Sequence, residues 1–292
     1  MVLVLRALGI GDLAAGVPAL RGLRAAFPRA RLALAAPAWL RPLAALTGAV
    51  DEVVPCDGLA PRPLPRADLA VNLHGRGPES HRLLAASAPG RLLGFATAGF
   101  DDGPVWTYEE HEVHRWCRML EWYGIRCDAA DLALRRPRAI REGHTVVHPG
   151  AKAAERRWPV DRYAAVAAAL RERGHDVVVT GSPAERPLAA AVAAAAGLPA
   201  RSVLAGGTDV GDLAALVAHA RLVVSGDTGV AHLATGYGTP SVTLFGPVPP
   251  RLWGPPPDRP QHRPLWHGAL LAVTVDEVLS AVDGVLDAVA AQ

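Results

Sequence analysis

Short apolar runs alternate with longer helical segments along the whole chain, and this alternation constrains the fold more than any other feature. The first run, residues 2–5, leads into a glycine-containing turn at residues 7–12. A continuous apolar run of this length is typical of a parallel strand buried on both faces. The same pattern predicts further strands and helices before residue 126: strands at 31–36, 68–75 and 91–96, and helices at 13–26 and 108–125.

A second series of the same kind starts near residue 144. It predicts strands at 144–150, 176–181, 202–206, 222–227 and 241–246, and helices at 160–173, 184–196, 211–220, 229–237 and 275–289. Two consecutive series of strand, loop and helix indicate an α/β fold with two doubly wound parallel sheets.

The charged, proline-containing stretch at 128–144 lacks periodicity and is predicted to connect two domains. We expect an N-terminal domain at 1–135, a C-terminal domain at 143–270 and a terminal helix within 271–292, with packing back on the N-terminal domain left open. Ligands of such sheets bind at the carboxyl ends of the strands, where the unusual loops of this chain fall. The cleft between the domains is therefore the expected active site.

The composition and net charge argue against several classes of protein. The chain has 292 residues, of which 50% are hydrophobic, and a formal net charge of +2, so nothing indicates a nucleic-acid partner. The three cysteines, Cys56, Cys117 and Cys127, form no C-x-x-C pair, which disfavours a disulfide scaffold or a zinc site. No apolar segment is long enough to predict a membrane span. We expect a cytoplasmic protein, with peripheral membrane contact left open.

The turn after the first strand carries Gly9, Gly11 and Asp12, and three interpretations are open. Glycines here allow a ligand to approach the backbone, as in a dinucleotide-binding loop. That interpretation is weak, since Ala14 stands where the third glycine belongs and no acidic residue follows the second strand. Asp12 is otherwise either a general base or a helix cap.

A second loop, between the predicted strand 222–227 and helix 229–237, predicts an anion site. The amides that follow Asp227, at Thr228 and Gly229, suit a diphosphate at a helix N-terminus. Asp227 either caps the helix or holds a donor hydroxyl. His232 lies one turn later, and for it a ligand contact and a core role are both open.

Further candidates follow other predicted strands. Arg156 or Arg157 could neutralise a phosphate, or both could be surface arginines. Glu185 lies in a first helical turn, where a ligand contact and simple dipole stabilisation are both open. His74, at the end of the third predicted strand, and Arg76, just after it, are assigned to the acceptor side. We expect no metal site, because His111 and His114 have no evident third ligand.

The order of these motifs resembles glycosyltransferase family 9, the lipopolysaccharide heptosyltransferases and their relatives. The motifs are the glycine-Asp loop, P-G-A before a basic residue and W-P, G-S-x-x-E, and D-T-G-x-x-H followed by G-T-P-S-V-T-L-F-G-P. The resemblance implies a GT-B fold, with two Rossmann-like domains facing across a cleft. It also implies inverting, metal-independent transfer without a cofactor, from a nucleotide diphosphate sugar, typically ADP-heptose.

The resemblance also implies residue roles. Asp12 falls on the catalytic aspartate, and Arg156 on a diphosphate contact that is commonly lysine. The implied donor contacts are Gly150, Ala151, Arg156, Glu185, Thr208, Asp227, Thr228, Gly229 and His232. Side-chain hydroxyl contacts that family members can have at Gly150 and Ala151 are missing here. The implied acceptor is a saccharide, a glycolipid or a small-molecule glycoside. Because the stretch between the third and fourth strands is short, a small acceptor remains one of the alternatives.

Three other functions remain to be tested against this one. A GT-B-like nucleotide-sugar epimerase or hydrolase would use the same donor site without an acceptor. A non-catalytic nucleotide-binding protein is disfavoured by Asp12, and a nicotinamide oxidoreductase by the missing acidic residue after the second strand.

Overall fold

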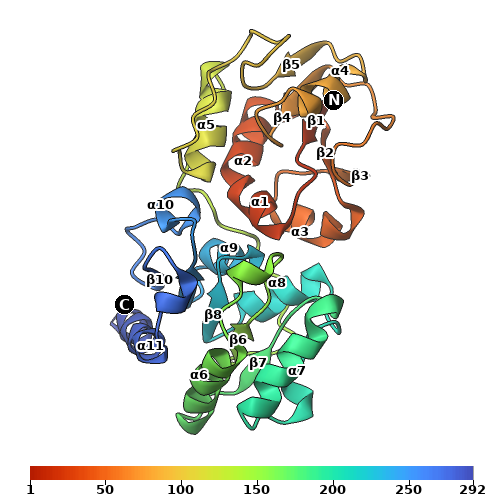
Figure 1. The fold of residues 1–292 in the computed structure, drawn as a ribbon. Helices are drawn as coiled ribbons and strands as arrows, with labels where there is room; N and C mark the ends of the chain where they lie inside the picture. The colour runs from red at the N-terminus through yellow and green to blue at the C-terminus, as the bar shows by residue number, and fades with distance from the viewer. Residues whose placement is uncertain (292) are drawn as a thin grey trace. The chain divides into compact units, whose positions relative to one another are not determined.

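The computed structural model describes residues 1–291, and its chain divides into two compact units, Met1–Arg135 and Arg136–Gln292. Each unit contains one parallel β-sheet with helices packed on it (Figure 1, red to yellow for the first unit and green to blue for the second). The predicted α/β class is therefore confirmed.

The sheet of the first unit has the strand order β3-β2-β1-β4-β5, with all neighbours parallel. Its strands are β1 (Val2–Leu5), β2 (Leu32–Ala36), β3 (Glu52–Pro55), β4 (Leu69–Asn72) and β5 (Arg91–Leu93). Its α-helices are α1 (Ile10–Ala15), α2 (Val17–Ala26), α3 (Arg41–Leu46), α4 (Glu79–Ala85) and α5 (Glu112–Trp122), with a 3₁₀ turn η1 (Ala38–Leu40). All residues of β1 and β2 are buried, as expected for the centre of a parallel sheet.

The sheet of the second unit has the order β10-β9-β8-β6-β7, again with all neighbours parallel. Its strands are β6 (Thr145–His148), β7 (Val177–Val179), β8 (Leu222–Gly226), β9 (Ser241–Phe245) and β10 (His262–Trp266). Its α-helices are α6 (Val160–Glu172), α7 (Arg186–Ala195), α8 (Val210–Ala218), α9 (Gly229–Tyr237), α10 (Pro250–Trp253) and α11 (Val275–Ala290). Its 3₁₀ turns are η2 (Ala154–Arg156), η3 (Pro183–Glu185), η4 (Ala200–Ser202) and η5 (Leu270–Ala272).

Several predicted elements need correction. The helix expected at 13–26 is two helices, α1 and α2, which meet at Gly16 just before Pro18. The strand expected at 202–206 is wrong: η4 occupies its start, and only one isolated bridge joins Val179 to Val203. The sequence pattern also missed β3 and β10. Both are edge strands that contain a proline, which weakens the strand signal.

The C-terminal helix is grouped with the second unit. Helix α11 packs on α6 and on strands β9 and β10. Its buried side chains, Val278, Val282 and Val285, recur at helical spacing and join the core of that unit.

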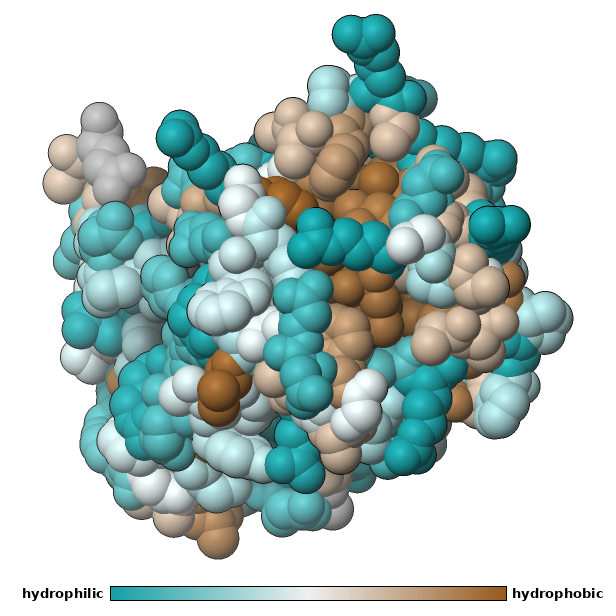
Figure 2. Space-filling view, turned by 90° about the horizontal axis from the view of Figure 1, so that it is seen from above, coloured by the Kyte–Doolittle hydropathy of each residue, from teal (hydrophilic) through white to brown (hydrophobic). Residues whose placement is uncertain are grey.

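The surface mixes hydrophilic and hydrophobic residues. On the face in Figure 2, hydrophilic residues border and interrupt the hydrophobic ones. Val105 and Tyr108 are among the large apolar side chains that stay exposed, at 77% and 66%. Within residues 1–291, no helix is both long and apolar enough to cross a membrane.

Candidate functional site

The loop between β1 and α1 holds Asp12 by its own backbone. Gly9 is the N-cap of α1, and its N–H donates to Asp12 Oδ2 at 3.1 Å. Asp12 is the third residue of the helix, so its carboxylate caps the N–H of Gly9 and it is not itself the N-cap. Gly11 lies inside α1. The Asp12 side chain is 28% exposed, so the carboxylate also remains accessible. The capping role and a role as base are compatible in this geometry.

Arg6, at the end of β1, is a neighbour of Asp12 that sequence reasoning missed. Its side chain is completely buried, its Nε donates to the backbone oxygen of Asp12 at 2.5 Å, and its Nη2 lies 3.9 Å from Asp12 Oδ1. Nη2 also donates to Glu112 Oε1 at 3.1 Å, on helix α5. An arginine directly after a buried apolar strand was the available signal, since such a charge must find partners inside the fold.

His74 lies on the loop after β4, which is the parallel neighbour of β1. The N–H of Ala7 donates to His74 Nδ1 at 3.2 Å, and the N–H of His74 donates to Asn72 Oδ1 at 3.0 Å. Burial lowers the pKa of His74, the positive charge of Arg6 lowers it further, and Asp12 opposes the change. The neutral ring therefore carries its proton on Nε2 and can donate one hydrogen bond beside Asp12.

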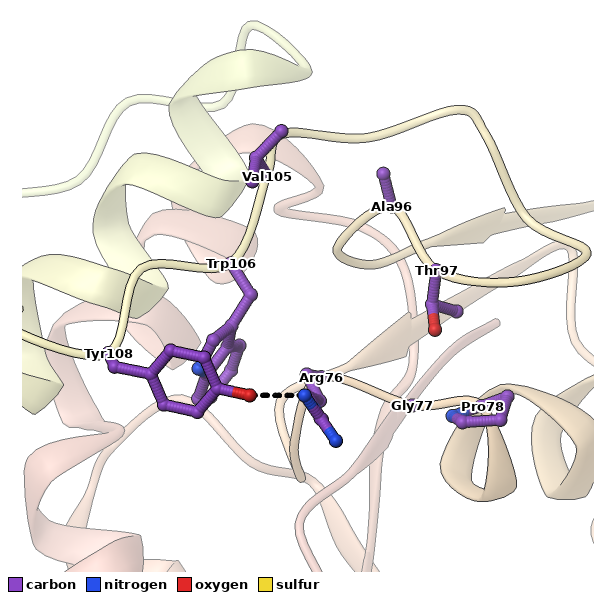
Figure 3. A pocket seen from close by; sticks show the side chains of 8 residues that line it. All are labelled: Arg76, Gly77, Pro78, Ala96, Thr97, Val105, Trp106 and Tyr108. Carbon is purple, nitrogen blue, oxygen red and sulfur yellow. Dashed lines mark hydrogen bonds between the residues drawn. The ribbon is translucent and has the colours of Figure 1, made fainter.

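A cavity of about 340 Å³ opens next to this loop, inside the first unit (Figure 3). It is lined by Arg76, Gly77, Pro78, Ala96, Thr97, Val105, Trp106 and Tyr108. Arg76 donates a hydrogen bond to the hydroxyl of Tyr108, as the dashed line in Figure 3 shows, and its guanidinium lies 5.7 Å from the centre of that ring. Trp106 packs edge-on against Phe95, with ring centres 4.9 Å apart. The cavity thus offers aromatic faces and a cation but no acidic lining residue.

In the second unit, the loop between β8 and α9 leads into a helix whose N-cap side chain makes no capping hydrogen bond. This N-cap residue is Thr228. Among residues 1–291, Thr228 Oγ1 and the nearby Ser225 Oγ are buried without a hydrogen-bond partner. The first turn of α9, which starts at Gly229, therefore keeps amide groups available at the positive end of the helix dipole.

Arg156 lies at this same loop. Its Nη2 donates to Asp227 Oδ2 at 2.5 Å and to the backbone oxygen of Asp227 at 2.8 Å. Its side chain remains 40% exposed. The neighbouring Arg157 turns to another partner, since its Nε donates to Ala151 O at 3.0 Å. The structure therefore brings Arg156, and not Arg157, to the start of α9.

Glu185 and Gly150 form a second contact pair in this unit. The N–H and hydroxyl of Ser182 both donate to Glu185 Oε2 at 2.8 Å. Burial opposes ionisation of Glu185, but Ser182 and then His148 and Arg157 outweigh it, so the pKa is lowered. A Cβ on Gly150 would lie 2.3 Å from Glu185 Oε1, so a larger residue at this position would displace the carboxylate.

The remaining predicted donor residues lie at other positions in the second unit. Thr208 lies partly buried on the loop before Asp209, the N-cap of α8. Ala151 is buried, and the ring of His232 packs edge-on against Trp253, with centres 5.7 Å apart. The sequence analysis did not select His148. Burial lowers the pKa of His148 to about 4, and its Nδ1 lies 3.0 Å from Thr180 Oγ1.

His111 and His114, the pair considered for a metal, have ring centres 5.6 Å apart. His111 is the N-cap of α5, where its Nδ1 accepts the N–H of Val113. Within residues 1–291, no group of three or more His, Cys, Asp or Glu side chains is arranged to hold a metal ion.

Comparison with known proteins decides the family. The model of glycosyltransferase family 9 (heptosyltransferase) matches residues 110–266, more than half of the chain. The chain belongs to glycosyltransferase family 9. Lipopolysaccharide heptosyltransferase 2 of Escherichia coli K12 is 27% identical over 87% of this chain and 85% of that protein. Lipopolysaccharide heptosyltransferase 3 of Escherichia coli is 33% identical over 40% of this chain, a match that spans only 35% of that protein.

Solved structures of family 9 proteins establish the fold. The structure of Escherichia coli ADP-heptose LPS heptosyltransferase II matches with a TM-score of 0.79 at 22% identity and covers 99% of both chains. The predicted GT-B fold and the predicted family are therefore confirmed. The family 9 match includes Arg156, Glu185 and Asp227, whereas Asp12 precedes its first residue.

Proposed function

We propose that this family 9 member is an inverting, metal-independent glycosyltransferase that moves heptose from ADP-heptose to a hydroxyl of a saccharide, glycolipid or small glycoside. The observation that carries the proposal is the loop of α9, where an uncapped helix N-terminus and the exposed guanidinium of Arg156 meet. A diphosphate needs this combination, because amides and a cation together neutralise its charge. Heptose and ADP are inferred from the similar proteins, a lipopolysaccharide heptosyltransferase and an ADP-heptose heptosyltransferase.

The second unit is the proposed donor domain. The diphosphate would take the place of Asp227 as partner of Arg156, and Thr228 and Gly229 would supply backbone donors. Glu185 is ionised and accepts hydrogen bonds, so it suits the ribose hydroxyls, and Gly150 leaves room for its carboxylate. The family resemblance assigns Ala151, Thr208 and His232 to the same donor.

The first unit is the proposed acceptor domain. The cavity beside Arg76 has the size of a small ligand site, and the rings of Trp106 and Tyr108 offer faces for a sugar ring. Asp12 lies at the same sheet edge with its carboxylate accessible, and His74 presents a donor next to it. Both suit the binding of a hydroxyl that is about to react.

The reaction is a single displacement. Asp12 accepts the proton of the acceptor hydroxyl while its oxygen bonds to the anomeric carbon and the bond from that carbon to the diphosphate breaks. Negative charge grows on the departing ADP, where Arg156 and the amides of α9 stabilise it. Attack opposite the leaving group inverts the anomeric configuration.

Two measurements test the proposal. A thermal-shift panel of ADP, UDP and GDP with their sugars should select ADP and ADP-heptose, with about 2.7 kcal/mol of stabilisation at roughly 100 times the dissociation constant. NMR of the product formed with lipopolysaccharide that lacks heptose, or with small glycosides, should show the inverted anomer. Release of free heptose alone would identify a hydrolase, an epimerised nucleotide sugar would identify an epimerase, and retained configuration would exclude single displacement.

A further inference from the structure

The first unit contains a buried cluster of three charged side chains that the proposed mechanism does not use. The side chains of Arg6, Glu112 and Arg115 are exposed by only 0%, 6% and 8%. Burying charges costs free energy unless each one is paired and hydrogen-bonded. The partners of the cluster show what it holds.

Arg6 binds two loops at the sheet edge. Its Nε holds the backbone oxygen of Asp12, and its Nη1 donates to the backbone oxygen of Leu73, next to His74. The third nitrogen, Nη2, reaches Glu112. One guanidinium therefore fixes the Asp12 loop and the start of the His74–Arg76 loop against helix α5.

Glu112 is the centre of the cluster. Its Oε1 accepts from Arg6 and, at 2.7 Å, from the indole of Trp116, while its Oε2 accepts from Arg115. Burial opposes ionisation, but Arg6, Trp116 and Arg115 outweigh it and lower the pKa of Glu112. The carboxylate is thus charged at neutral pH and joins the two arginines.

Arg115 carries the cluster to the wall of the cavity. Its Nη2 donates to the backbone oxygens of Thr107, Tyr108 and Glu110, at 3.1, 3.2 and 2.9 Å. Its guanidinium also lies 4.4 Å from the centre of the Trp106 ring. The segment that it holds therefore carries both aromatic rings of the proposed acceptor site.

We propose that Arg6, Glu112 and Arg115 form a positioning network that fixes the Asp12 carboxylate and the Trp106–Tyr108 wall of the acceptor cavity relative to each other. The inference rests on the proposed function, because it assigns Asp12 and the cavity to the transfer reaction. Arg6 fixes the position of Asp12, and Arg115 fixes the position of the cavity wall. Glu112 links the two arginines. Each arginine uses its planar fork for several bonds at once, which a lysine cannot reproduce.

The network predicts a split in kinetic constants among conservative variants. With ADP-heptose and heptose-free lipopolysaccharide, Arg6→Lys should lower kcat at least about tenfold and change the acceptor KM by less than about twofold, since small displacements of a reacting group are costly. Arg115→Lys should mainly raise the acceptor KM, and Glu112→Gln should do both. Arg21→Lys is the matched control. Arg21 also binds three partners in this unit, Thr47, Asp131 and Ala133, but none of them lies on the three connected segments.

Hydrogen exchange provides a second readout that needs no substrate. In Glu112→Gln, amides at 9–13, 73–76 and 107–110 should lose protection together, and in Arg21→Lys they should not. Loss confined to helix α5, or equal losses of kcat and of thermal stability in all four variants, would overturn the network. Asp12→Asn separates the two proposals. If it stops transfer while Arg6→Lys is normal, only the network fails, and if Asp12→Asn is active, the proposed base fails.

Discussion

The candidate sites of the two units are held in place by different kinds of interaction. In the first unit, Asp12 and the proposed acceptor cavity contact a buried, charged network that joins residues 106 positions apart in the chain. In the second unit, the candidate site consists of the start of α9, which has no side-chain cap, Gly150 beside Glu185, and the partly exposed side chain of Arg156. A base must be held at one position to act, whereas a diphosphate can be held by several weaker groups. The difference predicts sharper losses from changes in the first unit.

Asp12→Asn tests the sharpest expected loss. The amide keeps the size of the side chain and an oxygen that can accept the Gly9 N–H, so α1 should stay intact. Turnover should fall by about 10²–10⁴-fold, the usual contribution of a general base, while donor binding stays nearly unchanged. Single-turnover kinetics and ADP-heptose titration would measure both. Near-normal turnover would leave Asp12 with only its capping role.

Arg156 tests the second unit with a smaller expected effect. A charge-assisted hydrogen bond contributes about 1.5–3 kcal/mol, so Arg156→Ala should lower kcat/KM at least about tenfold. Arg156→Lys should recover much of this, because a point charge can serve the diphosphate. Arg157→Ala is the control and should do little, since its guanidinium contacts Ala151 O. A larger loss in Arg157→Ala would show that the wrong arginine has been assigned to the leaving group.

The same comparison explains what the sequence could predict. The second-unit candidates Arg156, Glu185 and Asp227 lie on contiguous motifs that follow strands, so the local pattern together with the family resemblance could select them for testing. Arg6 and Glu112 were not found, because Glu112 meets Arg6 only through a fold that brings α5 to the end of β1. The missed strands β3 and β10 show a related limit. They are edge strands with a proline, and only pairing with a neighbour defines them.

Acid should weaken the second unit more than the first. Burial lowers the pKa of His148 and His262 to about 4, below the ordinary value of 6.5. As pH falls from 6.5 to about 4, these histidines bind protons in the unfolded chain but not in the folded protein. The free energy of unfolding therefore decreases. Burial also lowers the pKa of His144 and His175 in the second unit, and of His74 and His81 in the first.

Glu112 titrates in the same sense but in a lower pH range. Its pKa is lowered from 4.5, so its contribution persists above that pH and disappears only as pH falls through the lowered value. Hydrogen exchange at pH 7 and pH 5 should therefore show a larger loss of protection in the second unit. His148→Gln combined with His262→Gln should reduce that difference, and an equal loss in both units would argue against it.

The smallest expected effect is that of metal removal, which should be none. The sequence contains no D-x-D pair, and the cation at the proposed diphosphate site is Arg156, whose guanidinium already lies at the start of α9. If arginine and helix amides neutralise the leaving group, excess EDTA should leave kcat/KM for ADP-heptose unchanged. The Arg156→Ala variant sharpens this test: added Mg²⁺ should not restore its activity, because no group of three or more His, Cys, Asp or Glu side chains within residues 1–291 is arranged to hold the ion. Activity of the unmodified protein that is lost to EDTA and restored by Mg²⁺ or Mn²⁺ would show instead that a bound cation stabilises the departing ADP, and that Arg156 serves mainly to hold Asp227.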